Sequence, residues 1–488
     1  MNNKHIAFIP FLILVYFFVH YTTDLFYFLD PEFSLKQFIK YFLVTGLLYF
    51  TGKTLFSDKE RFTLIFSTLL FIFLFFGTIL DTYTSIAHVK NISGIDLKLS
   101  LGFLMLCAGI ILLFNRANQQ LIKRSLTFWL VFILLVILYD AGSFIISDKK
   151  EKKYLAVLKA PDTISTVEKT GVFFLLFDMY PSDSVCKKYL HFDNTDLNTF
   201  LTEKDFFVTR NAHALYEETY YSLGSTLSLK PLDYLHDKTV KEYKKKLIAL
   251  KNIEYSAVPV IFERLGYIFR NYSVFNLLGQ PSPLQFNLNY HLENALTAST
   301  FYNRFYESIE PDFILANRNI DIGFLKRPWS HKVKNDLSTL NTEFNLLLDN
   351  YAKTNKPSFN YFHFMMPHPP VIYDSSGKEN SVKDMYGYNG FDKTIANYTG
   401  FIKFTNNEIK KMVNTIFEHA GKNVIVIIQG DHGYRGYSGH FPDELRSGIF
   451  NAVYLPGKNY HNFNDSISPI QTFQLILKNQ FGLNNSRY

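Results

Sequence analysis

The stretch Gly171-Val-Phe-Phe-Leu-Leu-Phe177 is a continuous apolar run that ends directly before an acidic residue, Asp178. An apolar run without polar alternation is typical of a strand that is buried on both faces of a sheet. Similar runs occur at 423–428 and 450–455, and a weaker one occurs at 359–364. Between the runs, residues 333–351 and 398–419 carry apolar side chains at helical spacing. This alternation predicts an α/β domain with a mixed, mostly parallel sheet that is flanked by helices.

Polar side chains follow these strands at the carboxyl ends, where ligands gather in α/β sheets. Asp178 follows the first run, and Gly430-Asp431-His432-Gly433 follows the run at 423–428. His363 lies at the end of the weaker run, and His368 follows it in a proline-rich turn. Two carboxylates brought together would repel unless a cation lay between them. Because carboxylates and neutral imidazole suit Zn²⁺ or Mn²⁺, we expect a divalent-metal site at this edge.

Each of these signals also has an ordinary structural explanation. An aspartate after a strand is most often a turn residue or a helix cap. A single histidine such as His363 can be a hydrogen-bonded core residue, and His368 can simply belong to its turn. The metal site is inferred from the joint placement of these residues at several strand ends.

A transfer or hydrolysis reaction also needs a nucleophile, and hydroxyl groups cluster in the stretch Glu217-Glu-Thr-Tyr-Tyr-Ser-Leu-Gly-Ser-Thr-Leu-Ser228. Thr219 lies where a helix is expected to begin, so the helix dipole and free N–H groups would favour its alkoxide and an incoming phosphate. A bound metal would lower the pKa of its hydroxyl further. The ordinary alternative is that Thr219 only caps the helix. The residues alone leave Thr219, Ser222 and Ser225 open as the nucleophile.

The N-terminal part of the chain contains apolar segments that are long enough to cross a bilayer, which takes about 20 helical residues. These segments run approximately over 5–22, 36–52, 62–82, 97–115 and 125–147. Buried core helices are the alternative, but five such runs in succession argue against it. We therefore expect a five-helix transmembrane domain at 1–147, a charged linker at 148–170 and an extracytoplasmic catalytic domain at 171–488.

The charges of the short loops predict the orientation, because positive residues concentrate on the cytoplasmic side. The loops expected inside carry Lys53, Lys59 and Arg61, then Arg116, Lys123 and Arg124. The loops expected outside carry Asp24, Asp30 and Glu32, then Lys90 and Asp96. The N-terminus is therefore predicted to be cytoplasmic, and an odd number of spans places the C-terminal domain outside. The lysines between 149 and 153 run against the rule, but large domains translocate largely regardless of charge.

The overall composition excludes two other classes of protein. The net charge is +7 over 488 residues, yet no basic run interleaved with aromatic residues resembles a nucleic-acid site. The chain has two cysteines, of which Cys107 lies in a predicted span and Cys186 in the soluble part. A disulfide framework and a cysteine metal site are therefore not expected, and the oligomeric state is left open.

The order of these features resembles the alkaline phosphatase and sulfatase superfamily: a strand with Asp178, a hydroxyl cluster, a histidine-containing strand and then Gly-Asp-His-Gly. Five apolar segments ahead of such a domain look more narrowly like bacterial lipoteichoic acid synthases and lipid A phosphoethanolamine transferases. A sulfatase would need a Cys-x-Pro-x-Arg context, whereas Cys186 is followed by Lys-Lys-Tyr. Hydrolysis of sulfate esters is therefore not expected.

The resemblance implies roles for individual residues. Asp178, Thr219, Asp431 and His432 would hold the main metal ion, Zn or Mn with Mg or Ca as alternatives, and Thr219 would be the nucleophile. His363 and His368 repeat the spacing of the paired histidines of phosphoethanolamine transferases. His368, His440, His363 and Arg435 would accordingly contact the substrate phosphate or a second metal. The protein would lie in the bacterial inner membrane as a multi-pass protein, with its catalytic domain periplasmic or extracellular.

Three functions remain in competition at this point. The first is a phosphotransferase that moves a headgroup (phosphoethanolamine or glycerol phosphate) from a membrane phospholipid to an envelope glycan or lipid. The second is a phosphoesterase or phosphodiesterase that uses the same phospho-threonine intermediate and takes water as acceptor. The third is a non-catalytic membrane receptor or scaffold, which an apolar residue at one of the four main metal positions would favour. None of those positions is apolar.

Overall fold

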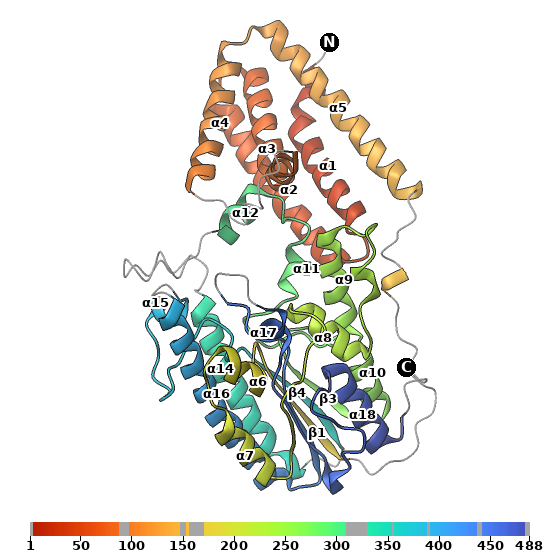
Figure 1. The fold of residues 1–488 in the computed structure, drawn as a ribbon. Helices are drawn as coiled ribbons and strands as arrows, with labels where there is room; N and C mark the ends of the chain where they lie inside the picture. Colours follow the sequence, from red (N-terminus) through yellow and green to blue (C-terminus); the bar gives the residue numbers. More distant parts are fainter. Residues whose placement is uncertain are drawn as a thin grey trace. The chain divides into compact units, whose positions relative to one another are not determined.

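The structure, a computed structural model, describes residues 3–86, 97–146, 153–155, 170–308, 329–353, 356–387, 391–436 and 442–483. The chain divides into two compact units (Figure 1). The first unit contains Met1–Lys152 together with Tyr290–Glu310, and the second contains Lys153–Asn289 and Pro311–Tyr488. The division predicted from the sequence, 1–147, 148–170 and 171–488, instead assigned residues 290–310 to the catalytic domain. The expected linker at 148–170 lies outside the described residues except for 153–155 and 170.

The first unit consists of helices, and each apolar segment of the sequence overlaps one of them; the segment at 5–22 also includes most of the 3-10 helix η1 (Asn3–Phe8). Their bounds are α1 (Ile9–Asp24), α2 (Pro31–Leu55), α3 (Lys59–Ile86), α4 (Leu97–Arg116) and α5 (Gln119–Ile146), joined by α11 (Tyr290–Asn294) and α12 (Phe301–Ser308). Among the described residues, three helical stretches are long and apolar enough to cross a membrane: His5–Asp24, Lys59–Ile86 and Gln119–Ile145. Residues Gly102–Arg116 form a shorter apolar helix. A helical, membrane-compatible N-terminal region is thus confirmed, while five crossings remain a prediction.

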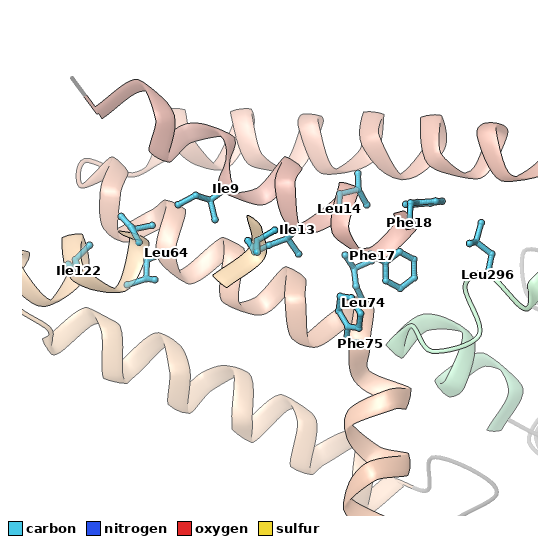
Figure 2. Close-up of a cluster of buried hydrophobic side chains, with 12 residues drawn as sticks. Ile9, Ile13, Leu14, Phe17, Phe18, Leu64, Leu74, Phe75, Ile122 and Leu296 are labelled. Carbon is cyan, nitrogen blue, oxygen red and sulfur yellow. The ribbon is translucent and has the colours of Figure 1, made fainter. Parts of the chain in front are cut away.

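The core of the first unit forms around α1 (Figure 2). The fully buried side chains of Ile13 and Phe17 are four residues apart and therefore lie on one face of the helix. They pack with Leu74 and Phe75 of α3 and with Ile122 of α5. This apolar face is what holds α1, α3 and α5 together.

The second unit is built on one six-stranded sheet with the order β2-β6-β5-β1-β4-β3. The strands are β1 (Gly171–Phe177), β2 (Phe207–Thr209), β3 (Ile268–Tyr272), β4 (Ser358–Phe364), β5 (Val424–Gly430) and β6 (Asn451–Tyr454). Neighbouring strands among β5, β1, β4 and β3 run parallel, whereas β6 pairs antiparallel with β5 and with β2. Every residue of β1, β4 and β5 is buried, as their continuous apolar character predicts. The expected mixed, mostly parallel sheet is confirmed.

Helices cover both faces of this sheet (Figure 1). One group contains α7 (Thr195–Glu203), α14 (Trp329–Asp349) and α16 (Phe391–Ala420). The other contains α8 (Thr219–Ser228), α9 (Glu242–Glu254), α10 (Ala257–Arg264) and α18 (Pro469–Phe481). The other α-helices that the structure describes in this unit are short: α6 (Asp183–Tyr189), α15 (Val382–Met385) and α17 (Asp443–Ser447). The helices expected at 333–351 and 398–419 correspond to α14 and α16, each of which begins a few residues earlier.

Local sequence explains where several helices begin and end. Ser468 and Gln471 form a capping box at the start of α18, and Pro469 occupies its first turn. Gly482 ends this helix in a left-handed conformation with φ of 65°. Ser182 caps α6 by accepting a hydrogen bond from the backbone N–H of Val185 at 3.3 Å.

Candidate metal centre

The register of the sheet brings the predicted acidic residues together. Phe177, the last residue of β1, pairs with Phe364 on β4 and with Gly430 on β5, so these three strands end at the same level. Asp178 and Asp431 are the next residues on two neighbouring strands, and His432 follows Asp431. One ligand atom of each of these three residues lies within 4.8 Å of the others. All three side chains are buried, with exposed fractions of 2%, 1% and 0%.

Asp431 is held in place through only one of its carboxylate oxygens. Its Oδ1 accepts hydrogen bonds from the backbone N–H of Met179 at 2.9 Å and of His432 at 2.8 Å. Its Oδ2 is buried and has no hydrogen-bond partner among the described residues. Close packing of Gly430 helps to fix this turn, because a Cβ there would lie 2.4 Å from the carbonyl oxygen of Tyr180. The turn can therefore form only with a residue that lacks a side chain.

His432 directs one ring nitrogen toward the two carboxylates. Its Nδ1 lies 2.9 Å from the carbonyl oxygen of Gly433. Since a carbonyl can only accept, Nδ1 carries a proton, and in the neutral ring Nε2 is then the nitrogen with the lone pair. Nε2 lies 3.3 Å from Thr219 Oγ1, 3.5 Å from Asp431 Oδ2 and 3.6 Å from Asp178 Oδ1. Thr219 Oγ1 and one oxygen of each carboxylate thus lie within 3.6 Å of this nitrogen.

This donor set fits a divalent cation. Asp178 Oδ1 is, like Asp431 Oδ2, buried without a hydrogen-bond partner among the described residues. A buried anionic oxygen without a partner is costly. Four ligands at bonds of about 2.0–2.1 Å would lie about 3.3–3.4 Å apart in a tetrahedron, close to the distances found around His432 Nε2. The buried group of Asp178, Asp431 and His432 can therefore hold a metal ion.

His363 contacts the carboxylate oxygen of Asp178 that is not directed toward His432. Its Nε2 lies 3.2 Å from Asp178 Oδ2, and its Nδ1 lies 3.4 Å from the hydroxyl of Tyr361. The ring of His363 is fully buried. Burial raises the pKa of Asp178, but His368, His363 and His432 outweigh it and hold the pKa of this carboxyl well below its usual range. His363 therefore orients one carboxylate oxygen and leaves the other directed toward the centre.

Thr219 is the first residue of α8, where the sequence predicted a helix start, and Glu218 occupies the capping position. Thr219 Oγ1 reaches His432 Nε2, as described above. In contrast, Ser222 Oγ donates to the carbonyl oxygen of Asp431 at 2.6 Å, and Ser225 Oγ donates to that of Ser222 at 2.8 Å. Of the three hydroxyls left open by the sequence, the one on Thr219 thus lies at the centre, while the other two are engaged with backbone.

Arg435 lies beside this centre in an ion pair that the sequence did not reveal. Its Nη1 donates to Glu218 Oε2 at 2.8 Å. Burial lowers the pKa of Arg435, but the carboxylates of Glu218, Asp178 and Asp431 raise it by more. The net pKa is therefore raised, and the guanidinium stays charged. The position of Glu218 directly before Thr219 was the only sequence signal for this contact.

The other two predicted site residues, His368 and His440, are not among the described groups that approach His432 Nε2. His368 is partly buried, and its ring centroid lies 6.3 Å from that of His432 and 5.9 Å from that of Trp329. Burial lowers the pKa of His368, against the opposing effect of Asp178. His440 lies outside the described residues. The structure therefore brings together Asp178, Thr219, Asp431 and His432, with His363, His368 and Arg435 around them.

A mixed α/β sheet with a buried group of two carboxylates and one imidazole beside a hydroxyl is an arrangement suited to a metal-assisted enzyme. The model of the family described as Sulfatase matches residues 183–467, which is more than half of the chain. The chain belongs to the sulfatase family and is an enzyme of the alkaline phosphatase superfamily. The resemblance seen in the sequence is thereby confirmed at the level of the superfamily.

The chain is similar to several solved structures at low sequence identity. The phosphonate monoester hydrolase of Agrobacterium radiobacter is 12% identical over 64% of this chain and 74% of that chain, with a TM-score of 0.41. The lipooligosaccharide phosphoethanolamine transferase A from Neisseria meningitidis, an integral membrane protein, is 12% identical over 98% and 84%, with a TM-score of 0.39. The zinc complex of the C-terminal periplasmic domain of EptC from Escherichia coli is 11% identical over 67% and 87%, with a TM-score of 0.39. None of the curated protein sequences matches the chain.

Proposed function

We propose that this protein is a membrane-anchored phosphotransferase. It would move a phospho-headgroup, phosphoethanolamine or glycerol phosphate, from a membrane phospholipid to an extracytoplasmic glycan or lipid. The observation that carries this proposal is the placement of Thr219 Oγ1, 3.3 Å from His432 Nε2, at the first residue of α8. A hydroxyl at a helix N-terminus, next to a histidine nitrogen that two unpaired carboxylate oxygens also approach, is suited to attack a phosphorus atom.

The proposed reaction has two steps at Thr219. In the first, Thr219 Oγ1 forms a bond to phosphorus, the bond from phosphorus to the glyceride oxygen breaks, and the proton of the Thr219 hydroxyl passes to the oxygen of the departing diacylglycerol. In the second, an acceptor hydroxyl attacks phosphorus, Oγ1 leaves, and the acceptor's proton returns to Thr219. The two steps exchange only phosphorus–oxygen bonds and protons, so they need no oxidant or reductant.

The side chains around Thr219 have separate tasks in this proposal. Asp178 Oδ1, Asp431 Oδ2, His432 Nε2 and Thr219 Oγ1 would hold the ion, Zn or Mn with Mg or Ca as alternatives. When bound, the ion supplies positive charge that lowers the pKa of the hydroxyl and stabilises the phosphoryl oxygens. His363 keeps Asp178 oriented through the contact at 3.2 Å. Arg435 and His368 bind the phosphate oxygens, with His440 as a further candidate.

The membrane part of the proposal rests on the helices of the first unit and on the loop charges. We propose five crossings by α1 to α5, with the N-terminus in the cytoplasm and the catalytic domain, 171–488, on the outer side of a bacterial inner membrane. An odd number of crossings and the lysines and arginines at 53–61 and 116–124 support this orientation. A site on that side of the membrane has both lipid headgroups and envelope acceptors as substrates.

The decisive experiment is a donor assay with the full-length protein in mixed phospholipid vesicles. Phosphatidylethanolamine and phosphatidylglycerol, each labelled in the glyceride part, are supplied separately, and diacylglycerol is measured. Release from one of them, dependent on divalent metal, is the expected result. Release that yields free headgroup phosphate even with acceptors present would instead indicate hydrolysis with water as acceptor. No release from either lipid would contradict the proposal.

A further inference from the structure

A segment from the middle of the catalytic part of the chain packs as part of the membrane unit. Residues Tyr290–Glu310 belong to the compact unit formed by Met1–Lys152. Their neighbours on both sides, Asn289 and Pro311, belong to the other unit. The segment also lies inside the residues that match the sulfatase family, 183–467. An element encoded within the catalytic domain has therefore joined the helical bundle.

The strongest contact is made at a kink in α3. Phe75 has non-helical backbone angles, φ −100° and ψ 15°, in the middle of this helix. A kink of this kind disturbs the regular backbone hydrogen bonds around it. The backbone N–H of Gly77 donates to the carbonyl oxygen of Ser299 at 2.6 Å, and Ser299 Oγ donates to the carbonyl oxygen of Leu74 at 3.1 Å. One residue thus satisfies backbone groups on both sides of the kink, and such groups are costly to leave unpaired in lipid.

Packing at this point is close enough to require glycine. A Cβ at Gly77 would lie 2.9 Å from the Cα of Ser299 and 2.7 Å from Nε of Arg304. The first of these atoms is backbone and cannot move aside without shifting the whole segment. A methyl group at position 77 would therefore push residues 299–304 away from α3.

Side chains on both flanks of Ser299 add apolar and ionic contacts. Leu296 is fully buried in the cluster that contains Phe17 and Phe18 of α1 (Figure 2). The ring of Phe301 stacks on Phe103 of α4, with centroids 4.0 Å apart. Arg304 forms an ion pair with Asp81 of α3 at 2.5 Å. The segment is therefore fixed at several independent points.

We propose that residues 290–308 are a docking segment, by which the catalytic part of the chain is attached to the membrane helices at the kink of α3. We further propose that this attachment is needed for use of a lipid donor and not for the chemistry at Thr219; this second statement rests on the proposed function. With the segment docked, the chain connects the two units at 289–290 and 310–311 as well as at 152–153. Additional connections restrict the volume that a tethered catalytic domain explores and raise its effective concentration at lipid headgroups.

Docking itself can be tested by cysteine cross-linking in the full-length protein in membranes. The pair Phe103→Cys and Phe301→Cys is introduced with Cys107→Ser, while Cys186 is retained because it is buried. The matched control replaces Tyr302, the next residue of α12, which is 54% exposed. We expect a disulfide with position 301 at a yield at least fivefold above that with position 302. Equal or negligible yields for the two pairs would overturn the docking.

The requirement of docking for use of a lipid donor is tested with Gly77→Ala. Its control is Gly109→Ala in α4. Both changes add one methyl group to a helical glycine, but nothing lies within 4 Å of a Cβ at Gly109. We expect Gly77→Ala to lower the cross-linking yield and to lower diacylglycerol release from vesicles at least tenfold. Cleavage of a soluble ester, bis(4-nitrophenyl) phosphate, should stay within twofold of the wild type, and Gly109→Ala should match the wild type in all three assays.

Each other outcome decides against one part of the proposal. Equal loss of soluble and lipid activity in Gly77→Ala would show that the segment serves folding and not donor use. Loss of cross-linking with full lipid activity would overturn the requirement for docking. If the wild type releases no diacylglycerol, the proposed phosphotransfer fails, and the cross-linking comparison alone still decides whether the segment docks.

Discussion

Two buried oxygen atoms, Asp178 Oδ1 and Asp431 Oδ2, determine what this centre can bind. Each lies on a carboxylate whose other oxygen is already engaged, with His363 in one case and with backbone N–H groups in the other. The free oxygens face the lone pair of His432 Nε2. Two anionic oxygens and a neutral nitrogen in a buried volume attract a divalent cation and repel an anion. We therefore expect the phosphate of the proposed substrate to reach this centre beside a bound metal ion and the Arg435 guanidinium.

The variant Asp431→Asn should lose the metal and keep the fold. The amide oxygen of asparagine can still accept from the N–H groups of Met179 and His432, so the turn is preserved, but the anionic ligand is gone. We expect bound metal, measured by elemental analysis of the purified protein, to fall at least tenfold. Asp183→Asn is the matched control, because Asp183 is also buried but pairs with Lys187 outside the centre. Full metal content in Asp431→Asn would show that the ion binds elsewhere.

Replacing the hydroxyl of Thr219 should separate chemistry from metal binding. A threonine hydroxyl is a weak neutral ligand, so Thr219→Ala should retain metal through the two carboxylates and His432. Loss of a nucleophile that forms a covalent intermediate lowers turnover by about 1,000-fold or more. Initial rates and metal content of the same preparation provide the measurement. A variant with turnover close to that of the wild type would remove Thr219 from its proposed role.

At the scale of elements, the centre is assembled where α8 meets the carboxyl end of β5. Ser222 joins the two, since its Oγ donates to the carbonyl oxygen of Asp431 at 2.6 Å. Thr219 lies on the turn of α8 just before it. This side-chain contact between a helix and a strand end helps to hold the proposed nucleophile at the centre.

Ser222→Ala should consequently lower stability and disturb the centre. Removing the hydroxyl leaves a buried carbonyl without this partner, which costs about 1–3 kcal/mol. Ser225→Ala is the internal comparison, because its hydroxyl bonds only within α8. Thermal unfolding of the purified proteins should show a larger fall in melting temperature for Ser222→Ala, and turnover should fall less than in Thr219→Ala. Equal melting temperatures for the two serine variants would mean that this contact does not hold α8 in place.

At the scale of the whole molecule, the proposed five crossings require that α2 spans the membrane. The helix α2 is not among the three helices that are long and apolar enough by composition. Its sequence includes Glu32, Lys36, Lys40 and Lys53. If α2 crosses, its two ends must lie on opposite sides, and the loop charges place its beginning outside.

Two exposed phenylalanines test this crossing. Phe26 precedes α2 and is 52% exposed, whereas Phe56 follows α2 and is 54% exposed. Each is replaced by cysteine in a Cys107→Ser background, and intact cells are treated with a thiol reagent that does not cross membranes. We expect labelling at position 26 in intact cells and at position 56 only after the membrane is opened. Labelling of both positions in intact cells would rule out a crossing by α2.

The sequence alone determined the parts of this protein that depend on neighbours along the chain. Continuous apolar runs specify strands buried on both faces, and the runs at 171–177 and 359–364 match β1 and β4 to within one residue. The same local pattern places an acidic residue after each of two runs, Asp178 directly after 171–177 and Asp431 shortly after 423–428. The start of α8 at Thr219 was also predictable, because helix starts are encoded by local residue types.

Only the tertiary structure decided the choices that depend on residues far apart in sequence. It placed the hydroxyl of Thr219 beside His432, turned Ser222 toward a carbonyl oxygen, and set His363 behind Asp178. It also paired Arg435 with Glu218 and packed residues 290–308 against α3. Periodicity along a chain shows which face of an element is apolar, but the partner of a polar group is set by the folded chain as a whole, because that partner can come from any element that packing brings near.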